Sequence, residues 1–166
     1  YDDLLSQLSV LKRKFFKYED YASADMMALF GEDLMNTTPF MDINETSTSL
    51  FINQDGQFSR VALPTEVQYS STYAIEIMDV NQDGVMDILI GGNHYAVKPQ
   101  YGRDDASKGW LLLGHKNDQG AYEAGDVEVL GVVGEIRDIV KLNSEEIIIS
   151  TTNNGVKSYK INYVQE

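Results

Sequence analysis

The sequence predicts a mainly β protein with an N-terminal helical segment. Apolar residues recur every three or four positions in the first part of the chain, and they alternate with polar residues from residue 47 onward. The β pattern also repeats itself after about sixty residues. A chain of 166 residues therefore accommodates a helical segment at 1–46 and a β region at 47–166.

The helical segment contains two predicted amphipathic stretches. The first carries an apolar stripe at helical spacing, made of Leu4, Leu5, Leu8, Leu11, Phe15 and Phe16. The second is predicted to begin with Ser23 as its N-cap and Asp25 in its first turn. Gly31 interrupts this second stretch, so we expect a short or kinked helix there.

Strands follow from residue 47. The predicted β elements are a hairpin at 47–64 that turns at Gln54, Asp55 and Gly56, strands at 72–80 and 86–92, a hairpin at 110–124 that turns at 117–120, a strand-loop-strand unit at 134–151 and a closing strand at 154–164. The strand at 72–80 alternates, with Ala74, Glu76 and Met78 on one face and Tyr73, Ile75 and Ile77 on the other.

Two matching pairs of residues define the repeat. Gly56 and Gly120 lie 64 positions apart, and Ile75 and Ile136 lie 61 positions apart. The unit is then a hairpin followed by strand-loop-strand, which is typical of a four-stranded β-propeller blade. We therefore expect about two such blades, forming a partial propeller. The predicted boundaries are 47–92 for the first blade, 93–108 for an inserted loop and 109–166 for the second blade.

The stretch DVNQDGVMD, residues 79–87, crowds acidic side chains into a predicted connection between strands. Ca²⁺ takes about six to eight oxygen ligands from carboxylates, amides and backbone carbonyls. Alternate residues of a tight loop can direct their oxygens at one centre, and Gly84 permits the sharp turn. The predicted ligands are the side chains of Asp79, Asn81, Asp83 and Asp87 and the backbone carbonyl of Val85.

Electrostatics favours a cation in this loop, and calcium is the expected cofactor. Two carboxylates about 4 Å apart repel by roughly 4 kcal/mol at an effective dielectric constant of about 20. Mg²⁺ prefers a smaller and more hydrated site. A calcium sensor of the EF-hand type needs a Glu at the twelfth loop position, where this chain has Ile90 in an apolar strand. An acid-rich hairpin turn without a metal stays open as the alternative.

Composition excludes several classes of function. A formal net charge of -13 argues against nucleic-acid binding and against docking on anionic lipid. The chain has no cysteine, which excludes disulfides and thiolate metal sites. No apolar run approaches the length of a membrane helix, and no signal peptide is visible. Because the chain begins at Tyr1 rather than Met, we expect a processed protein or a fragment.

The segment AIEIMDVNQDGVMDILIGGN, residues 74–93, resembles the FG-GAP or VCBS repeat, the blade unit of integrin-type β-propellers. Asp79, Asn81, Asp83, Val85 and Asp87 fall on the calcium-ligand positions of that repeat. More widely, the chain resembles the C-terminal region of bacterial VCBS-repeat proteins of the ASPIC/UnbV group, in segments such as VALPTEVQYSSTYAI and IIISTTNNGVKSYKI. The second copy, VKLNSEEII, lacks the ligand loop, so no ligand is carried onto it.

The resemblance implies an exported protein that is periplasmic, cell-surface or extracellular. It implies a calcium-stabilised module that binds an unknown protein or glycan and catalyses no known reaction. Two blades are fewer than a closed propeller needs, so the resemblance implies exposed blade edges that pair with the rest of a longer chain or form a homodimer. No nucleic acid and no membrane insertion are expected.

The inserted loop holds the candidates for alternative functions. An enzyme needs a nucleophile, a base and an orienting group, and none of these sets is recognisable there, so we expect no catalysis. One interpretation is a loop held by an ion pair from Arg103 to Asp104 or Asp105. The other is a platform for sugar or peptide that uses Tyr101, Arg103 and Asp104, as in a carbohydrate-binding or carbohydrate-active accessory domain. The candidates considered are His94, Tyr95, Tyr101, Arg103, Asp104 and Asp105.

Overall fold

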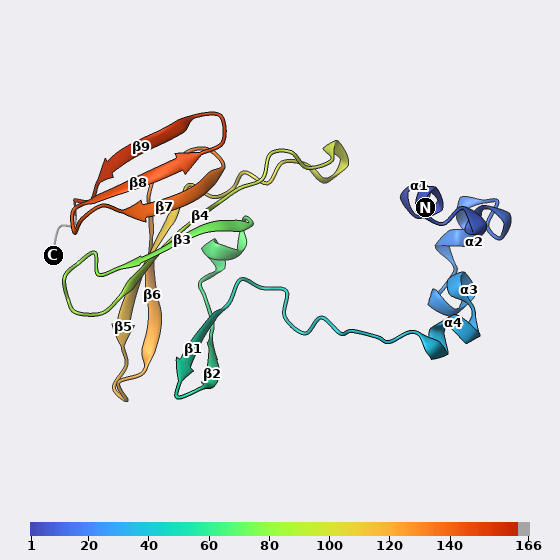
Figure 1. The fold of residues 1–166 in the computed structure, drawn as a ribbon, viewed down its shortest axis with the longest axis horizontal. Helices are drawn as coiled ribbons and strands as arrows, with labels where there is room; N and C mark the ends of the chain where they lie inside the picture. Colours follow the sequence, from blue (N-terminus) through green and yellow to red (C-terminus); the bar gives the residue numbers. More distant parts are fainter. Residues whose placement is uncertain (163–166) are drawn as a thin grey trace. The chain divides into compact units, whose positions relative to one another are not determined.

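The computed structural model describes residues 1–162 of the chain. It contains two compact units, Tyr1–Glu45 and Thr46–Glu166. The first unit is helical and the second is built from strands (Figure 1). The prediction of a mainly β protein with an N-terminal helical segment is therefore confirmed. The end of the predicted closing strand, at 163 and 164, lies outside the described residues.

The helical unit consists of short helices, namely α1 (Asp2–Gln7), η1 (Ser9–Arg13), α2 (Tyr18–Ala22), α3 (Met26–Phe30) and α4 (Glu32–Thr37). The first predicted stretch is broken because Leu8 and Lys17 leave the helical conformation. These breaks let Leu5, Leu11 and Phe15 meet in one small core. Packing thus decides the outcome, since a single short amphipathic helix is marginally stable by itself.

The second stretch is divided at Gly31, whose φ of 84° separates α3 from α4. The predicted N-cap at Ser23 was wrong. Asp25 caps α3 instead, because its carboxylate accepts a hydrogen bond of 2.7 Å from the Ala28 N–H. No helix among the described residues is long and apolar enough to cross a membrane.

The β unit contains three antiparallel sheets within residues 1–162. The first is a hairpin of β1 (Leu50–Gln54) and β2 (Gln57–Val61). The second has four strands in the order β3 (Thr72–Met78), β4 (Asp87–Gly92), β5 (Trp110–Lys116) and β6 (Tyr122–Val129). The third has the order β7 (Ile136–Lys141), β8 (Glu146–Thr151) and β9 (Gly155–Lys160). Two 3₁₀ turns, η2 (Thr65–Gln68) and η3 (Pro99–Tyr101), lie in the connections.

The strands group differently from the blades predicted at 47–92 and 109–166. The β1–β2 hairpin pairs with no further strand in the described part of the chain, and β4 pairs instead with β5, where Ile90 faces Trp110. The prediction was wrong because an internal match measures the length of a repeat but not where a sheet begins. Residues 1–162 close into neither a barrel nor a propeller.

Two sheets enclose the main core of the β unit. β7 packs against β3 and β4 (Figure 1). The buried side chains of this inter-sheet core are Ala74, Met78, Val80, Leu89, Leu111, Val132, Ile136, Ile139, Ile147 and Ile149. The other face of the four-stranded sheet carries a second core, made of Ile88, Ile90, Trp110 and Leu112 with Val67 from η2. Removal of these apolar side chains from water is the main source of stability for the sheets.

Candidate metal centre

The predicted metal loop joins β3 to β4, and Asp87 is the first residue of β4. Two loop residues have left-handed backbone conformations, Gln82 with a φ of 60° and Gly84 with a φ of 85°. Gly84 adopts this conformation without strain because it has no Cβ. The two bends reverse the chain within a few residues, so the loop is a tight antiparallel connection, as the sequence predicts.

Three of the predicted ligands turn inward onto the amides of the loop. Asp79 accepts hydrogen bonds from the N–H groups of Asp83 at 3.1 Å and Gly84 at 3.0 Å. Asp83 accepts one from the Val85 N–H at 2.7 Å and one from the Asn81 side-chain amide at 2.9 Å. The Asn81 side-chain oxygen in turn accepts a bond from the Asp83 N–H at 3.1 Å. Asp79, Asn81 and Asp83 thus form one network.

Asp87, the fourth side-chain ligand predicted, has a different environment. It is fully buried, and its carboxylate accepts hydrogen bonds from the Val80 N–H at 2.7 Å and the Gly114 N–H at 2.8 Å. These charge-assisted bonds offset part of the large cost of burying a carboxylate. Asp87 therefore ties the beginning of the loop to β5, at the point where the β5–β6 register shifts between Leu112 and Gly114.

The donor chemistry of the loop fits a hard divalent cation. Carboxylate and amide oxygens are calcium ligands, and an ionised carboxylate has about four lone-pair sites, so the amide contacts of Asp79 and Asp83 leave acceptor capacity for an ion. Within residues 1–162, however, no three His, Cys, Asp or Glu side chains form a metal-holding cluster. The set of five ligands therefore stays a prediction.

A groove of about 320 Å³ lies beside the loop. The residues that line it are Asn81 and Asp83 from the loop and Leu113, Gly114, His115, Gly125 and Asp126 from β5 and β6. Asp83 and Asp126 give this groove a negative charge. The sequence analysis did not identify Asp126, because its approach to the loop depends on the pairing of β5 with β4.

Tyr122 on β6 is a polar residue near Asp87 that the sequence does not mark. Its hydroxyl is buried and has no hydrogen-bond partner in the described part of the chain. Burial, and secondly the negative charge of Asp87, raise the pKa of Tyr122. The hydroxyl therefore stays protonated. Because it is buried without a hydrogen-bond partner, its desolvation lowers the stability of the fold at the base of the loop.

The inserted loop at 93–108 is anchored by Asn93. This residue is 1% exposed and has a φ of 86°. Its amide donates to the carbonyls of Ser107 and Gly134, both at 2.8 Å. Its oxygen accepts from the Ser107 N–H at 2.9 Å and lies 2.7 Å from the Ser70 hydroxyl oxygen. Because Gly134 lies just before β7, Asn93 connects the two larger sheets.

An ion pair between the buried Glu135 and the half-buried Arg137 lies next to Asn93. Glu135 is 5% exposed, and Arg137 approaches its carboxylate to 2.6 Å. The Arg137 guanidinium also donates to the Asn93 carbonyl at 3.1 Å and lies 4.3 Å from the centre of the Tyr73 ring. His94 places its Nδ1 atom 3.8 Å from the Glu135 carboxylate. These contacts hold the beginning of β7 against β3.

The predicted platform residues have separate surroundings. Tyr101 is 76% exposed. Arg103 pairs with Asp105 at 3.6 Å, and its guanidinium lies 3.9 Å from the centre of the Tyr95 ring. The ion pair expected from Arg103 to one of two aspartates is thus made with Asp105.

Asp104 is held by the body of the β unit. Its carboxylate accepts hydrogen bonds from the Ser70 hydroxyl and from the Ser71 N–H at 3.1 Å, and its backbone pairs with His94. Burial acts to raise the pKa of Asp104, but the bonds from Ser70 and Ser71 and the nearby His94 outweigh it, so the pKa lies below its ordinary value. Asp104 therefore anchors the inserted loop in this structure.

No protein-family model, curated protein or solved structure matches this chain. The functional proposal therefore depends on the chain's own residues and on their arrangement.

Proposed function

We propose that this chain is a calcium-stabilised extracellular interaction module with β-propeller-type blades of the FG-GAP or VCBS kind. The observation that carries the proposal is the loop D-x-N-x-D-G-x-x-D between two paired antiparallel strands, with Asp79, Asn81 and Asp83 turned inward into one network. A plain solvated turn does not require this density of carboxylates.

The sheet arrangement supports the blade interpretation. The four-stranded sheet is a simple antiparallel meander, which is the form of a propeller blade. The β7–β8–β9 sheet also begins with two adjacent antiparallel strands. Its strand β7 packs on one face of the four-stranded sheet. The unit of the repeat is then strand-loop-strand followed by a hairpin, and the β1–β2 hairpin lies before the first such unit.

The proposed ion has a structural role. A bound Ca²⁺ neutralises the carboxylates of the loop and cross-links the end of β3 to the beginning of β4. Asp79 and Asp83 already accept loop amides, so the folded chain prearranges part of the donor set. Because the ion binds the folded form, it stabilises that form by mass action.

The proposed location is outside the cytoplasm, in the periplasm, at the cell surface or in the extracellular medium, and the partner is a protein or a glycan. We propose no catalysis, because Asp104, Glu135 and Arg137 are engaged in holding the fold. A carbohydrate-binding accessory domain is the second candidate, favoured by the exposed Tyr101 and by the Arg103–Tyr95 stack in the inserted loop.

Isothermal titration of chelator-treated protein with CaCl₂ tests the main proposal. We expect saturable binding at one site per chain and much weaker binding of Mg²⁺. The variants Asp79→Asn and Asp83→Asn should bind more weakly, whereas Asp118→Asn in the β5–β6 turn serves as the control that leaves binding unchanged. Absence of saturable calcium binding at millimolar concentrations would contradict the proposal.

A further inference from the structure

Residues 39–44 follow α4, at the end of the first unit, and adopt no regular structure. α4 ends at Thr37 and β1 begins at Leu50, and the chain contains neither a helix nor a strand between them (Figure 1). Every residue of 39–44 is exposed. Within residues 1–162, no described hydrogen bond or ion pair involves this stretch. Its backbone can therefore enter the cleft of another protein without breaking a contact of the fold.

The side chains of this stretch are as accessible as its backbone. Phe40, Met41 and Ile43 are 66%, 92% and 82% exposed. None of them belongs to one of the three apolar cores described in residues 1–162. Single exposed apolar side chains are common on protein surfaces. Here three of them follow one another closely on a backbone that nothing holds in place, and such a stretch can be bound by another protein in an extended form.

The charges around this stretch limit the kind of enzyme that could act on it. Exposed segments without regular structure are preferred sites of proteolytic cleavage. Asp42 is the only charged residue of 39–44, and the chain has no Lys or Arg between Lys17 and Arg60. An endopeptidase whose acidic pocket selects Lys or Arg therefore has no bond to cut here, whereas one with a hydrophobic pocket accepts Phe40 or Met41.

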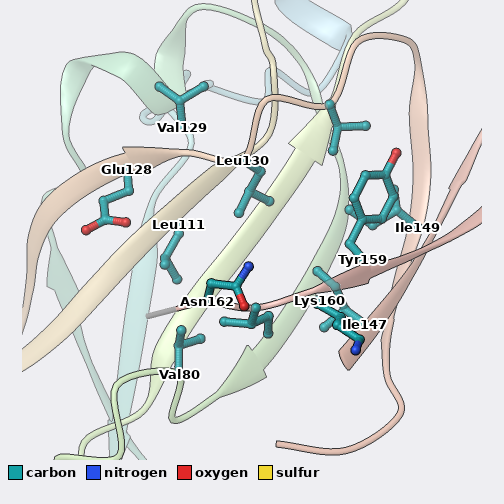
Figure 2. A pocket seen from close by; sticks show the side chains of 12 residues that line it. Val80, Leu111, Glu128, Val129, Leu130, Ile147, Ile149, Tyr159, Lys160 and Asn162 are labelled. Carbon is teal, nitrogen blue, oxygen red and sulfur yellow. The ribbon is translucent and has the colours of Figure 1, made fainter. Parts of the chain in front are cut away.

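A cut in this stretch would leave the apolar core of each unit complete. The core of the helical unit ends at Leu29, and the second core of the β unit begins at Leu50. The inter-sheet core lies entirely in the β unit, and Figure 2 shows Leu111 and Ile149 of this core beside a pocket of about 300 Å³. Since residues 30–49 contribute no side chain to these three cores, cleavage removes no apolar burial from them.

We propose that residues 39–44 are a proteolytic processing site, cut on the carboxyl side of Phe40 or Met41 by an endopeptidase that selects large apolar side chains. The reaction is hydrolysis. At Met41, the bond from its carbonyl carbon to the Asp42 nitrogen breaks, and a bond from that carbon to the oxygen of water forms. Met41 then ends in a carboxylate, and the new fragment begins with the amine of Asp42. The cut releases the β unit, with its proposed metal loop, as a separate folded module.

Other exposed aromatic residues are poorer substrates because their backbone is held. Tyr101 is 76% exposed, but its N–H donates to the Lys98 carbonyl at 2.9 Å in η3. Phe16 is 81% exposed, but the buried Phe15 precedes it. A cut at either position requires local opening of the fold, and the population of the open form limits the rate. We therefore expect cleavage within 39–44 to be at least about tenfold faster than at these two positions.

Limited digestion of the full chain tests the inference. The protein is treated with a low ratio of chymotrypsin in EDTA, and mass spectrometry identifies the first bond that is cut. We expect that bond within 39–44, and we expect trypsin to leave this stretch uncut. The triple variant Phe40→Ser, Met41→Ser, Ile43→Ser should lose the early cut at an unchanged melting temperature, whereas the control Phe16→Ser should keep it. A first cut elsewhere in the chain, or an early cut that survives the triple variant, would overturn the inference.

Calorimetry of the digest gives the second measurement. The released β unit is expected to keep the melting temperature that it has in the intact chain, and a fragment that melts earlier would overturn the inference. The inference does not require calcium, so titration of the fragment with CaCl₂ separates the two proposals. A folded fragment that binds no calcium contradicts only the metal site, and a chain that binds calcium but resists cleavage within 39–44 overturns only the processing site.

Discussion

The Asp87 carboxylate accepts a hydrogen bond of 2.8 Å from the backbone N–H of Gly114, which lies 27 residues away. The same carboxylate accepts the Val80 N–H at 2.7 Å. The last acidic residue of the loop therefore connects β4 to β5 and to the beginning of the loop. This contact belongs to the protein fold itself.

Replacement of Asp87 by alanine is expected to destabilise the β unit strongly. The change leaves the buried N–H groups of Val80 and Gly114 without acceptors, at about 1–3 kcal/mol each. We therefore expect a loss of roughly 3 kcal/mol or more in the free energy of unfolding, measured by urea denaturation in EDTA. Asp83→Ala, which removes an exposed carboxylate, is the control and should cost less than about 1 kcal/mol under the same conditions. Equal losses for the two variants would show that Asp87 has no special structural role.

Calcium is expected to raise the melting temperature of the β unit. A ligand at about one hundred times its dissociation constant stabilises the folded state by about 2.7 kcal/mol. For a unit of this size we expect a rise of roughly 8 °C, followed by differential scanning calorimetry. Asp79→Asn should reduce the rise because it removes a loop carboxylate, while Asp126→Asn tests whether the neighbouring groove contributes. An unchanged melting temperature in saturating calcium would argue for an acid-rich turn without a metal.

The sequence predicts the type of each element better than its grouping. Alternation along residues 72–80 and the apolar run at 86–92 predict the strands that form β3 and β4, and the turn at Asp55 and Gly56 predicts the first hairpin. The sequence does not reveal that β4 also pairs with β5, because the β1–β2 and β5–β6 hairpins have similar patterns of apolar and polar residues. The pairing of β4 with β5 places Trp110 opposite Ile90 and Leu112 opposite Ile88. This register is a property of the folded chain.

The loop residues could be identified from spacing alone, since Asp79, Asn81 and Asp83 alternate within five positions. The network around Asn93 could not. Its amide reaches Gly134, 41 residues away, and Arg137 reaches the Asn93 carbonyl from β7. Contacts of this kind depend on how two sheets pack, and no local pattern of residues encodes them.

Tyr122→Phe is expected to leave the β unit as stable as before or slightly more stable. The Tyr122 hydroxyl is buried near Asp87 and has no hydrogen-bond partner within residues 1–162. Its removal abolishes a desolvation cost of about 1 kcal/mol or more while the aromatic ring keeps its packing. Urea denaturation measures the change. Tyr73→Phe is the control on β3, where the exposed ring stacks on Arg137 and no gain is expected. A clear loss of stability in Tyr122→Phe would show that the hydroxyl has a partner in solution.

Asp104 is expected to make the anchoring of the inserted loop sensitive to acid. Its folded-state pKa lies below the ordinary value of 3.8, so its ionised form contributes stability above that value, and this contribution is lost as the pH falls through the lower folded-state pKa. Asp104→Asn should therefore be less stable than the wild type at neutral pH and should lose less stability on acidification below about pH 4. Asp105→Asn is the matched control, because Asp105 pairs only with the exposed Arg103 among the contacts described for it.

Hydrogen exchange of the His94 amide, which donates to the Asp104 carbonyl at 2.8 Å, reports opening of the loop at each pH. If Asp104→Asn and the wild type follow the same acid profile, the bonds from Ser70 and Ser71 do not hold the loop.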